Sequence, residues 1–115
     1  MVIAVGEHTL GKVPEMLIRA ACPFGGGLGG TKEELCGVLS GGTLILGAMR
    51  DRLSSEEKDE ALYALIRQFR ERFIARMGTA QCKVIYNALP DVRKRCAPVV
   101  EEGTRILVEL MQENP

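Results

Sequence analysis

The sequence has no tryptophan, and aromatic side chains make up only 4% of its 115 residues. A core without large rings has to be built mostly from Leu, Ile, Val, Ala and Met, and such a composition favours helices. The chain also has no excess of charge, because its 15 basic side chains balance its 15 acidic ones. Nucleic acid and anionic membranes attract proteins with a basic excess, so we expect neither as the main partner.

Other absences narrow the class of protein further. No apolar run approaches the roughly 18 residues of a membrane-spanning helix; the longest candidate is Leu44–Met49. The first residues lack the basic start, long apolar centre and small-residue cleavage site of a signal peptide, so we expect a cytoplasmic protein. His8 is the only histidine, which excludes a histidine-rich zinc site. No C-x-x-C pair occurs, so the commonest zinc and thioredoxin-type signatures are missing.

Four cysteines are present: Cys22, Cys36, Cys82 and Cys96. In a reducing cytoplasm we expect reduced, metal-bound or redox-active thiols in place of structural disulfides. Residues 22–42 hold two of these cysteines and eight of the thirteen glycines. Glycine loses the most backbone freedom on folding, so this segment is costly to order. Three features could require so many glycines: a phosphate-binding loop, a tight helix crossing, or a site where sulfur faces a metal or another sulfur.

The spacing of apolar residues predicts helices and no strands. Thr31 and Ser54 each stand three residues before a glutamate, a pattern typical of helix N-caps. Glycine and proline residues mark the ends of several predicted helices, as at Gly11, Gly78 and Pro90. We predict an all-α fold, a single domain over residues 1–115 with about five helices and a glycine-rich loop before a buried central helix. The expected helices span residues 1–10, 14–21, 32–49, 55–77 and 80–89, with a last one from residue 98.

The glycine-rich loop formally matches the G-x-G-x-x-G pattern of dinucleotide-binding proteins at residues 25–30, and Asp51 follows about twenty residues on. In those proteins the pattern follows a strand within a parallel βαβ unit. Here it follows Cys-Pro and a helical stretch, so we do not expect nucleotide binding. An anion at the start of the predicted Thr31 helix, with Cys36 as a nucleophile, is a weaker alternative.

Three cysteines are expected at or near helix N-termini: Cys36 in the second turn of the Thr31 helix, Cys82 in the first turn of its helix, and Cys96 just before the last helix. The unpaired N–H groups there carry partial positive charge, which favours the thiolate, the form that acts as nucleophile and metal ligand. Lys94 and Arg95 would act on Cys96 in the same direction. The alternative is that these cysteines serve as small apolar filler in the core.

Gly37 and Gly41 lie four residues apart on the predicted central helix. Glycines at this spacing allow another backbone to come close, which would bring neighbouring groups within reach of Cys36. We therefore place both glycines beside a bound cofactor, with plain close packing of the helix as the alternative.

At residues 36–41, which read C-G-V-L-S-G, the sequence resembles a family of small redox-active proteins named for its pattern C_GCAxxG_C_C. Val38 replaces the usual alanine of that motif. The preceding F-G-G-G-L-G-G, the segment F-R-E-R-F-I-A-R-M-G-T-A-Q-C up to Cys82, and the closing segment from Cys96 also resemble the family. The resemblance covers most of the chain and implies an all-helical domain whose cysteines do redox or iron–sulfur chemistry. The family usually begins with a further cysteine on its first helix, for which Cys22 is the candidate substitute here.

We expect a thiol protein in which Cys36, Cys82 and Cys96, with Cys22, gather at one end of the fold. These thiols would cycle between dithiol and disulfide, or all four would bind an iron–sulfur cluster or zinc. A redox partner protein or a homodimer is the expected partner. The alternative is a non-catalytic helical interaction module, a homodimer whose cysteines are merely packed. An exposed apolar face on the last helix would favour that alternative.

Overall fold

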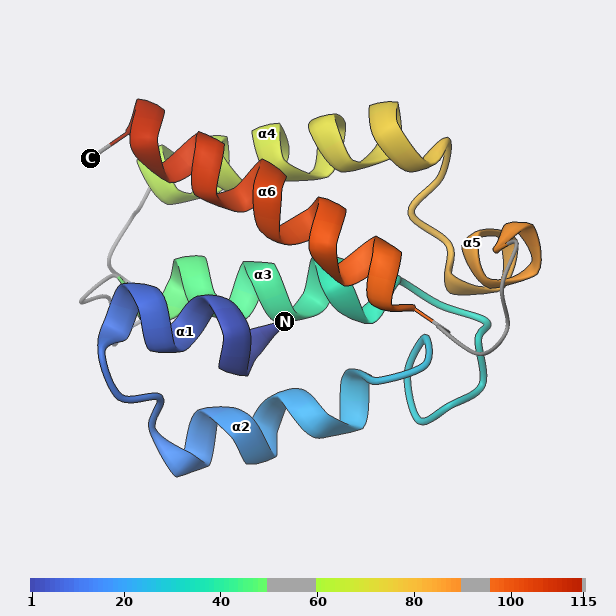
Figure 1. Ribbon diagram of the computed structural model, residues 1–115, viewed down its shortest axis with the longest axis horizontal. Coiled ribbons are helices and arrows are strands. Elements are labelled where there is room, and N and C mark those ends of the chain that lie inside the picture. The colour runs from blue at the N-terminus through green and yellow to red at the C-terminus, as the bar shows by residue number, and fades with distance from the viewer. Residues whose placement is uncertain (50–59, 90–95, 115) are drawn as a thin grey trace.

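The fold is given by a computed structural model, which describes residues 1–49, 60–89 and 96–114 (Figure 1). The described residues form six α-helices and one short 3-10 helix, with no β-strand among them, so the all-α class is confirmed. None of these helices is long and apolar enough to cross a membrane. The elements are α1 (Val2–Leu10), α2 (Glu15–Ala21), η1 (Cys22–Phe24), α3 (Gly37–Ala48), α4 (Glu60–Met77), α5 (Cys82–Ala88) and α6 (Ala97–Glu113).

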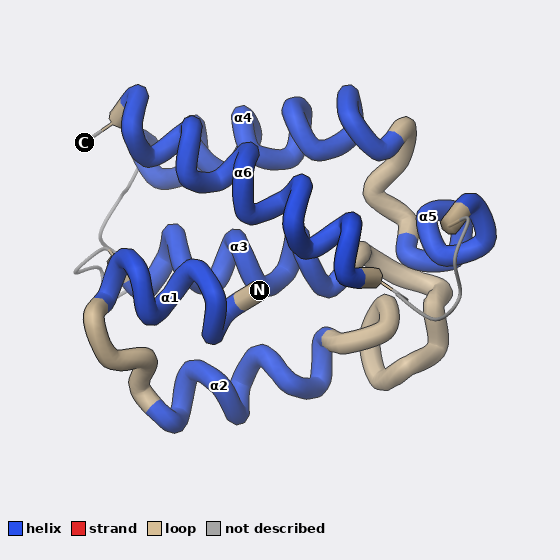
Figure 2. Tube along the Cα trace, viewed as in Figure 1, coloured by secondary structure: helices blue, strands red, loops and turns tan. Residues whose placement is uncertain are grey.

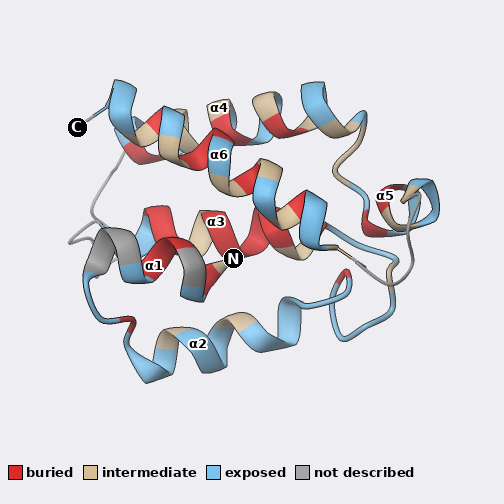
Figure 3. Cartoon of the chain, in the orientation of Figure 1, coloured by how far each residue is buried: buried red, intermediate tan, exposed pale blue. Residues whose placement is uncertain are grey.

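Helix α3 is the buried central helix that the sequence predicts. Its own apolar and small residues cover most of its circumference, and it contacts α1, α2, α4 and α6. Figure 3 shows buried positions along most of its length, and the last two residues, Gly47 and Ala48, are exposed. Its buried residues are Val38, Leu39, Ser40, Gly41, Gly42, Ile45 and Leu46.

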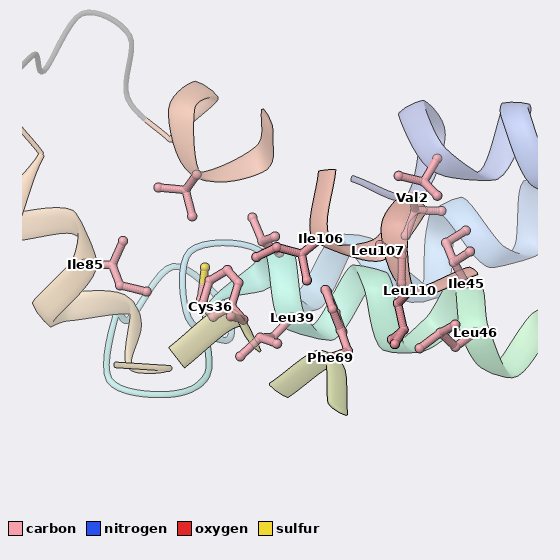
Figure 4. Close-up of a cluster of buried hydrophobic side chains, with 14 of the residues drawn as sticks. Val2, Cys36, Leu39, Ile45, Leu46, Phe69, Ile85, Ile106, Leu107 and Leu110 are labelled. Carbon is pink, nitrogen blue, oxygen red and sulfur yellow. The ribbon is translucent and has the colours of Figure 1, made fainter. Parts of the chain in front are cut away.

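Helices α4 and α6 cover one side of α3 and contact each other. The three- and four-residue spacing of their apolar residues produces the expected buried faces. Phe69 and Phe73 of α4 are fully buried, and their rings meet edge to face with centroids 6.5 Å apart. Ile106 and Leu107 of α6 lie in the same cluster (Figure 4). This cluster is the main core of the fold.

The predicted start of the central helix at Lys32 is wrong. Helix α3 begins at Gly37, with Cys36 as its N-cap. The Thr31 hydroxyl donates to the carbonyl oxygens of Gly27 and Leu28, at 2.9 Å each, and so closes the glycine loop. Such local bonds of threonine compete with helix formation. Lys32 has a φ of 62°, which no residue of a right-handed helix adopts.

Helix α5 begins two residues later than predicted, at Cys82. The Thr79 hydroxyl accepts a hydrogen bond from the N–H of Gln81, at 3.1 Å, and Gln81 is the N-cap. Ala80 cannot join the helix because its carbonyl oxygen accepts a bond from the N–H of Cys36. The predicted Ser54 cap and the start of its helix at residue 55 lie outside the described residues. Helix α6 begins at Ala97, with Pro98 in its first turn as expected.

The glycine-rich loop is a left-handed turn. Five successive residues, 26 to 30, have φ values between 59° and 77°. Glycine adopts this region freely, whereas other residues pay a steric cost, here at Leu28 alone. The turn is closed by backbone hydrogen bonds, among them Lys32 N–H to Gly26 O at 2.7 Å and Gly29 N–H to Pro23 O at 2.7 Å. The glycine content of this segment is therefore explained by backbone conformation, without a phosphate. Figure 2 shows the turn as loop between α2 and α3.

Helix α2 lies on the outside of the bundle. It contacts α1 and α3, yet none of its residues is buried. Figure 3 shows it exposed along its length, in contrast to α3. It lies against the bundle without entering the core, and η1 connects it directly to the left-handed turn.

Candidate functional site

The N-terminal ends of three helices meet at one end of the bundle (Figure 1). Cys36 is the N-cap of α3, Cys82 is the first residue of α5, and Cys96 is the N-cap of α6. Cys22 opens η1, beside the left-handed turn. We call this set of four cysteines the cysteine pole. The expectation that three cysteines stand at helix N-termini is confirmed, with Cys36 closer to its helix start than predicted.

Backbone hydrogen bonds join the segment that contains Cys36 to the segment that contains Cys82. The N–H of Cys36 donates to the carbonyl oxygen of Ala80 at 2.8 Å, and the N–H of Cys82 donates to that of Glu34 at 3.0 Å. Leu35 and Gln81, the residues between them, form an isolated antiparallel bridge. Side chains alternate along paired backbones, so Cys36 and Cys82 lie diagonally on the same face of this short pairing. Two cysteines 46 residues apart in sequence are thus held side by side.

Gly27 makes room for this arrangement. A Cβ atom on Gly27 would lie 2.6 Å from the Cβ of Cys82 and 2.8 Å from the Cα of Lys32, so no side chain fits there. A Cβ on Gly37 would lie 3.4 Å from the carbonyl oxygen of Phe24, which is ordinary van der Waals contact. The backbone of residues 24–26 therefore approaches Gly37, but at a distance that would also accommodate a Cβ atom.

A cavity of about 360 Å³ opens at this end of the bundle, and all four cysteines line it. Cys36 and Cys82 are buried, each with 6% of its surface exposed, while Cys96 is half-buried and Cys22 is exposed. Gly37 and Gly41, which the sequence places beside a cofactor, line the same cavity. The predicted site residues therefore lie together, although cofactor binding by the two glycines stays a prediction.

Burial raises the pKa of the Cys36 thiol above its ordinary value. The N–H groups of Val38 and Leu39, in the first turn of α3, lower the pKa, but burial outweighs them. The negative charges that Cys82 and Cys96 would carry raise it further, because like charges disfavour ionisation. The expectation of a thiolate at this helix N-terminus is therefore wrong for Cys36, since desolvation exceeds the effect of the helix end.

Burial also raises the pKa of Cys82, and the charge of Cys96 adds to this. Lys32 acts in the opposite direction, because its ammonium group favours the thiolate. The same ammonium group lies 3.8 Å from the centre of the Tyr86 ring, which fixes its position. The predicted influence of Lys94 and Arg95 on Cys96 falls outside the described residues. All three thiols nevertheless act electrostatically on one another, which requires that they lie close together.

Sequence reasoning misses Lys32. No motif marks it, and its place beside Cys82 follows from pairing with a distant segment, in which the N–H of Lys83 donates to the Lys32 carbonyl oxygen at 2.9 Å. Its left-handed backbone turns it out of the helix in which the sequence predicts it. Only the tertiary fold reveals this residue.

In the arrangement described here, the cysteine pole does not have the geometry of a metal site. Among residues 1–49, 60–89 and 96–114, no three Cys, His, Asp or Glu side chains are placed so that they could hold one metal ion. Zinc and iron–sulfur centres are held by thiolates that converge on one point, which this arrangement does not provide among the described residues. A zinc ion or iron–sulfur cluster on the four cysteines therefore stays a prediction, without support from this arrangement.

Cys36 also belongs to the hydrophobic core, as the alternative of packed cysteines requires. Figure 4 shows it between Ile85 of α5 and Leu39 of α3. Two observations distinguish it from ordinary filler: it lines an open cavity, and that cavity contains three further thiols. The exposed apolar face expected on the last helix of an interaction module is not found within Ala97–Glu113, where Glu101, Arg105 and Glu109 are exposed.

Val38, the departure from the usual motif, packs against Gly103 of α6. A Cβ on Gly103 would overlap the Cγ1 atom of Val38, so the two positions are complementary in size. A small residue on α6 thus provides the space that the larger side chain at position 38 needs.

Comparison with known families gives one match. The family described as "Putative redox-active protein (C_GCAxxG_C_C)" matches residues 1–110. No curated protein and no solved structure matches the chain. The match covers nearly the whole sequence, and it includes all four cysteines and the glycine-rich turn. The chain therefore belongs to the C_GCAxxG_C_C family.

Proposed function

We propose that the cysteine pole carries out dithiol–disulfide exchange, with Cys36 and Cys82 as the pair that forms the disulfide. The observation that supports this most directly is their backbone pairing, which holds two distant cysteines on one face at the wall of a cavity. The charge of Cys82 acts on Cys36 more strongly than that of Cys96 does, which favours this pair over Cys36–Cys96.

Cys96 is the thiol through which exchange begins. Among the three cysteines at helix N-termini it is the half-buried one, whereas Cys36 and Cys82 are almost inaccessible, so an incoming disulfide reaches it more easily than either of them. The Cys96 thiolate attacks one sulfur of the substrate disulfide, and the other sulfur leaves with the electron pair of the broken bond. The Cys82 thiolate then attacks the Cys96 sulfur of this mixed disulfide, and the second substrate sulfur leaves as a thiolate. The Cys36 thiolate next attacks the Cys82 sulfur, which releases Cys96 as a thiolate and leaves the Cys36–Cys82 disulfide.

The overall reaction balances without a cofactor. Two cysteine thiols lose two protons and two electrons and form one S–S bond, while the substrate S–S bond breaks and takes up the same protons and electrons as two thiols. The substrate disulfide is the oxidant, and it can belong to a small molecule or to a partner protein. The reverse reaction regenerates the protein dithiol from two substrate thiols.

The raised pKa values set the direction in which this couple works. A strongly oxidising dithiol protein owes its potential to a stabilised thiolate in the reduced form. Burial destabilises the thiolates of Cys36 and Cys82 here, so the reduced form gains no such stabilisation. We therefore expect a couple on the reducing side, one that passes electrons to disulfides.

The test is to treat the anaerobically reduced protein with a small disulfide and then to alkylate the remaining thiols. We expect two of the four thiols to be lost and the peptides that contain Cys36 and Cys82 to be linked within one chain. Cys36→Ala and Cys82→Ala should each abolish this link. Val84→Ala, at an exposed position on the same helix as Cys82, is the matched control and should retain it.

The proposal fails if all four thiols remain free under conditions in which free cysteine exchanges, or if only links between molecules form. It also fails if freshly made protein contains stoichiometric zinc or iron that is lost in the Cys36→Ala and Cys82→Ala variants. In that case the thiols would be metal ligands, and the sulfurs would have to move from the positions described above.

A further inference from the structure

The side chains that line the cavity at the cysteine pole are uncharged within the described part of the chain. Each lining residue there is apolar, a glycine or a cysteine, so none of their side chains contributes an oxygen or nitrogen atom to the wall. Its volume of about 360 Å³ falls within the range of small-molecule sites, which are mostly apolar with a few reactive or polar groups. The four thiols are the reactive groups of this one.

The cavity has a floor and a mouth. Cys36, Cys82 and Val2 at the floor are buried, while Ile3 and Ile18 are exposed by 52% and 36% and lie at the mouth. Ile18 belongs to α2, the helix without buried residues, so one wall of the cavity lies outside the main core. A molecule that enters between α1 and α2 would meet exposed residues such as Ile3 and Ile18 first and the buried thiols of Cys36 and Cys82 last.

We infer that this cavity binds a small, uncharged, apolar molecule, and that its substrate is a low-molecular-weight uncharged disulfide; this second part rests on the proposed function. A charged group that leaves water for this lining would find no charged or nitrogen- or oxygen-bearing side chain among the described lining residues, which is costly. Lys32 is close enough to act on Cys82 but does not line the cavity, so it offers no counter-charge within it. An apolar molecule carries no such penalty.

The reaction inside the cavity is the exchange already described. The S–S bond of the small disulfide R–S–S–R breaks, each R–S group leaves as a thiol with one proton from a cysteine, and the protein retains one internal S–S bond. The products are two small apolar thiols. No further oxidant or reductant is required.

The first test compares three disulfides on the reduced protein: neutral diethyl disulfide, the dianion of 3,3′-dithiodipropionate, and the dication of cystamine. Each rate is divided by the rate of the same disulfide with free cysteine, which removes differences in intrinsic reactivity. We expect the neutral disulfide to exceed both charged ones by about tenfold or more, the size of a modest desolvation penalty. Equal normalised rates for all three would overturn the inference.

Two variants on α2 introduce the same charge at a residue that lines the cavity and at a residue that does not. Ile18→Lys puts an ammonium group at the cavity mouth and should raise the normalised rate of the dianion relative to the neutral disulfide. Met16→Lys is the control, because Met16 lies on the same helix with 73% of its surface exposed and does not line the cavity. The inference predicts that only Ile18→Lys changes the preference; the same change in both variants would contradict it.

A second test measures binding without chemistry. Dipropyl sulfide has no S–S bond to exchange, so it reports occupancy alone. We expect it to shift the backbone amide NMR signals of Gly25, Gly26, Gly37 and Gly41, all of which line the cavity. Ala21→Phe, which fills the cavity from α2, should abolish these shifts, while Ala20→Phe at the exposed neighbouring position should retain them.

The two tests separate the inference from the proposed function. Binding of dipropyl sulfide in a protein that never exchanges disulfides would overturn the exchange activity and leave the cavity as an apolar binding site. Exchange that shows no preference for uncharged disulfides, together with no shifts from dipropyl sulfide, would retain the activity and overturn the assignment of the cavity.

Discussion

Two regions of this molecule, the α4–α6 side of the bundle and the cysteine pole, are stabilised by different interactions. The α4–α6 side of the bundle depends on apolar side chains, with Phe69, Phe73 and Leu107 completely buried. The cysteine pole depends on backbone: a left-handed turn, an isolated bridge between two loops, and a helix, α2, with no buried residue. The first arrangement excludes water and leaves no reactive group. The second leaves a cavity, and the backbone bonds around it hold the thiols in place.

This contrast indicates where stability and chemistry are located. Burial of a large apolar side chain stabilises the fold by about 1.5–3 kcal/mol, roughly twice the net contribution of about 0.5–1.5 kcal/mol from one backbone hydrogen bond. The core therefore carries most of the free energy of unfolding, and the cysteine pole can tolerate an open cavity.

Phe69→Ala should destabilise the protein most. Phe69 is completely buried, contacts Phe73, and lies against Gly42 so closely that a Cβ there would be 2.5 Å from its ring. We expect the free energy of unfolding in urea to fall by about 3–5 kcal/mol. Met16→Ala, on the exposed helix α2, should change it by less than about 0.5 kcal/mol. Similar losses in the two variants would mean that the core is not concentrated on the α4–α6 side.

Gly27→Ala should disturb the cysteine pole. The new Cβ would meet the Cβ of Cys82 at 2.6 Å, and the φ of 70° adds steric strain. Gly29→Ala is the matched control, because Gly29 has a similar φ of 59° but no atom within 4 Å of the new Cβ. The strain common to both should cost about 1–2 kcal/mol, and the contact should cost Gly27→Ala about 1–3 kcal/mol more.

Alkylation of Cys82 provides a second measurement on the same pair. Its rate with iodoacetamide should change in Gly27→Ala, where the pairing of the Cys82 segment is displaced, and should stay near that of the parent in Gly29→Ala. Equal stability losses together with equal Cys82 rates would show that Gly27 serves the turn alone.

Stability should fall at alkaline pH because of the buried thiols. A pKa raised in the folded state means that the folded protein holds its thiol protons more tightly than the unfolded chain does. This contribution is fully present below the ordinary thiol pKa of 9.0 and is lost as the pH rises through the raised values. Urea midpoints measured from pH 7.5 to 10.5 should therefore decline above about pH 9. The decline should be smaller in Cys36→Ala than in the Val84→Ala control, and an identical decline would contradict the burial effect.

The ion pair between Arg72 of α4 and Glu113 of α6 should have the smallest effect. Their side chains meet at 2.6 Å but remain 37% and 53% exposed. A double-mutant cycle with Arg72→Ala and Glu113→Ala should give an interaction of about 0.2–1 kcal/mol that decreases in 0.5 M salt. A coupling as large as the loss in Phe69→Ala would mean that charge, and not apolar burial, holds α4 to α6.

The sequence predicted the core better than it predicted the cysteine pole, for physical reasons. Helices α4 and α6 are long, and the regular spacing of their apolar residues predicts which face of each helix is buried. Thr31 resembled a helix cap, but its hydroxyl bonds backward to the glycine loop, a choice that depends on the loop conformation.

The reactivity of the cysteines was predictable only in part. Their location at helix N-termini is correct for Cys36, Cys82 and Cys96. For Cys36 the local signal behind it was wrong, because Thr31 does not cap a helix. Their protonation depends on how deeply the fold buries them, which no local pattern reveals, and this is why the expected thiolate at Cys36 was wrong. The position of Lys32 also depends on a tertiary pairing.

The most direct test of the account is a disulfide map of the protein after limited oxidation, in native buffer and in 6 M guanidinium chloride. In the unfolded chain, loop closure favours the pairs that are nearest in sequence, Cys22–Cys36 and Cys82–Cys96, each with thirteen residues between its members. The account predicts that the native protein forms Cys36–Cys82, whose members are far apart in sequence and adjacent in the fold. A native map dominated by the same short-range pairs as the unfolded chain would contradict it.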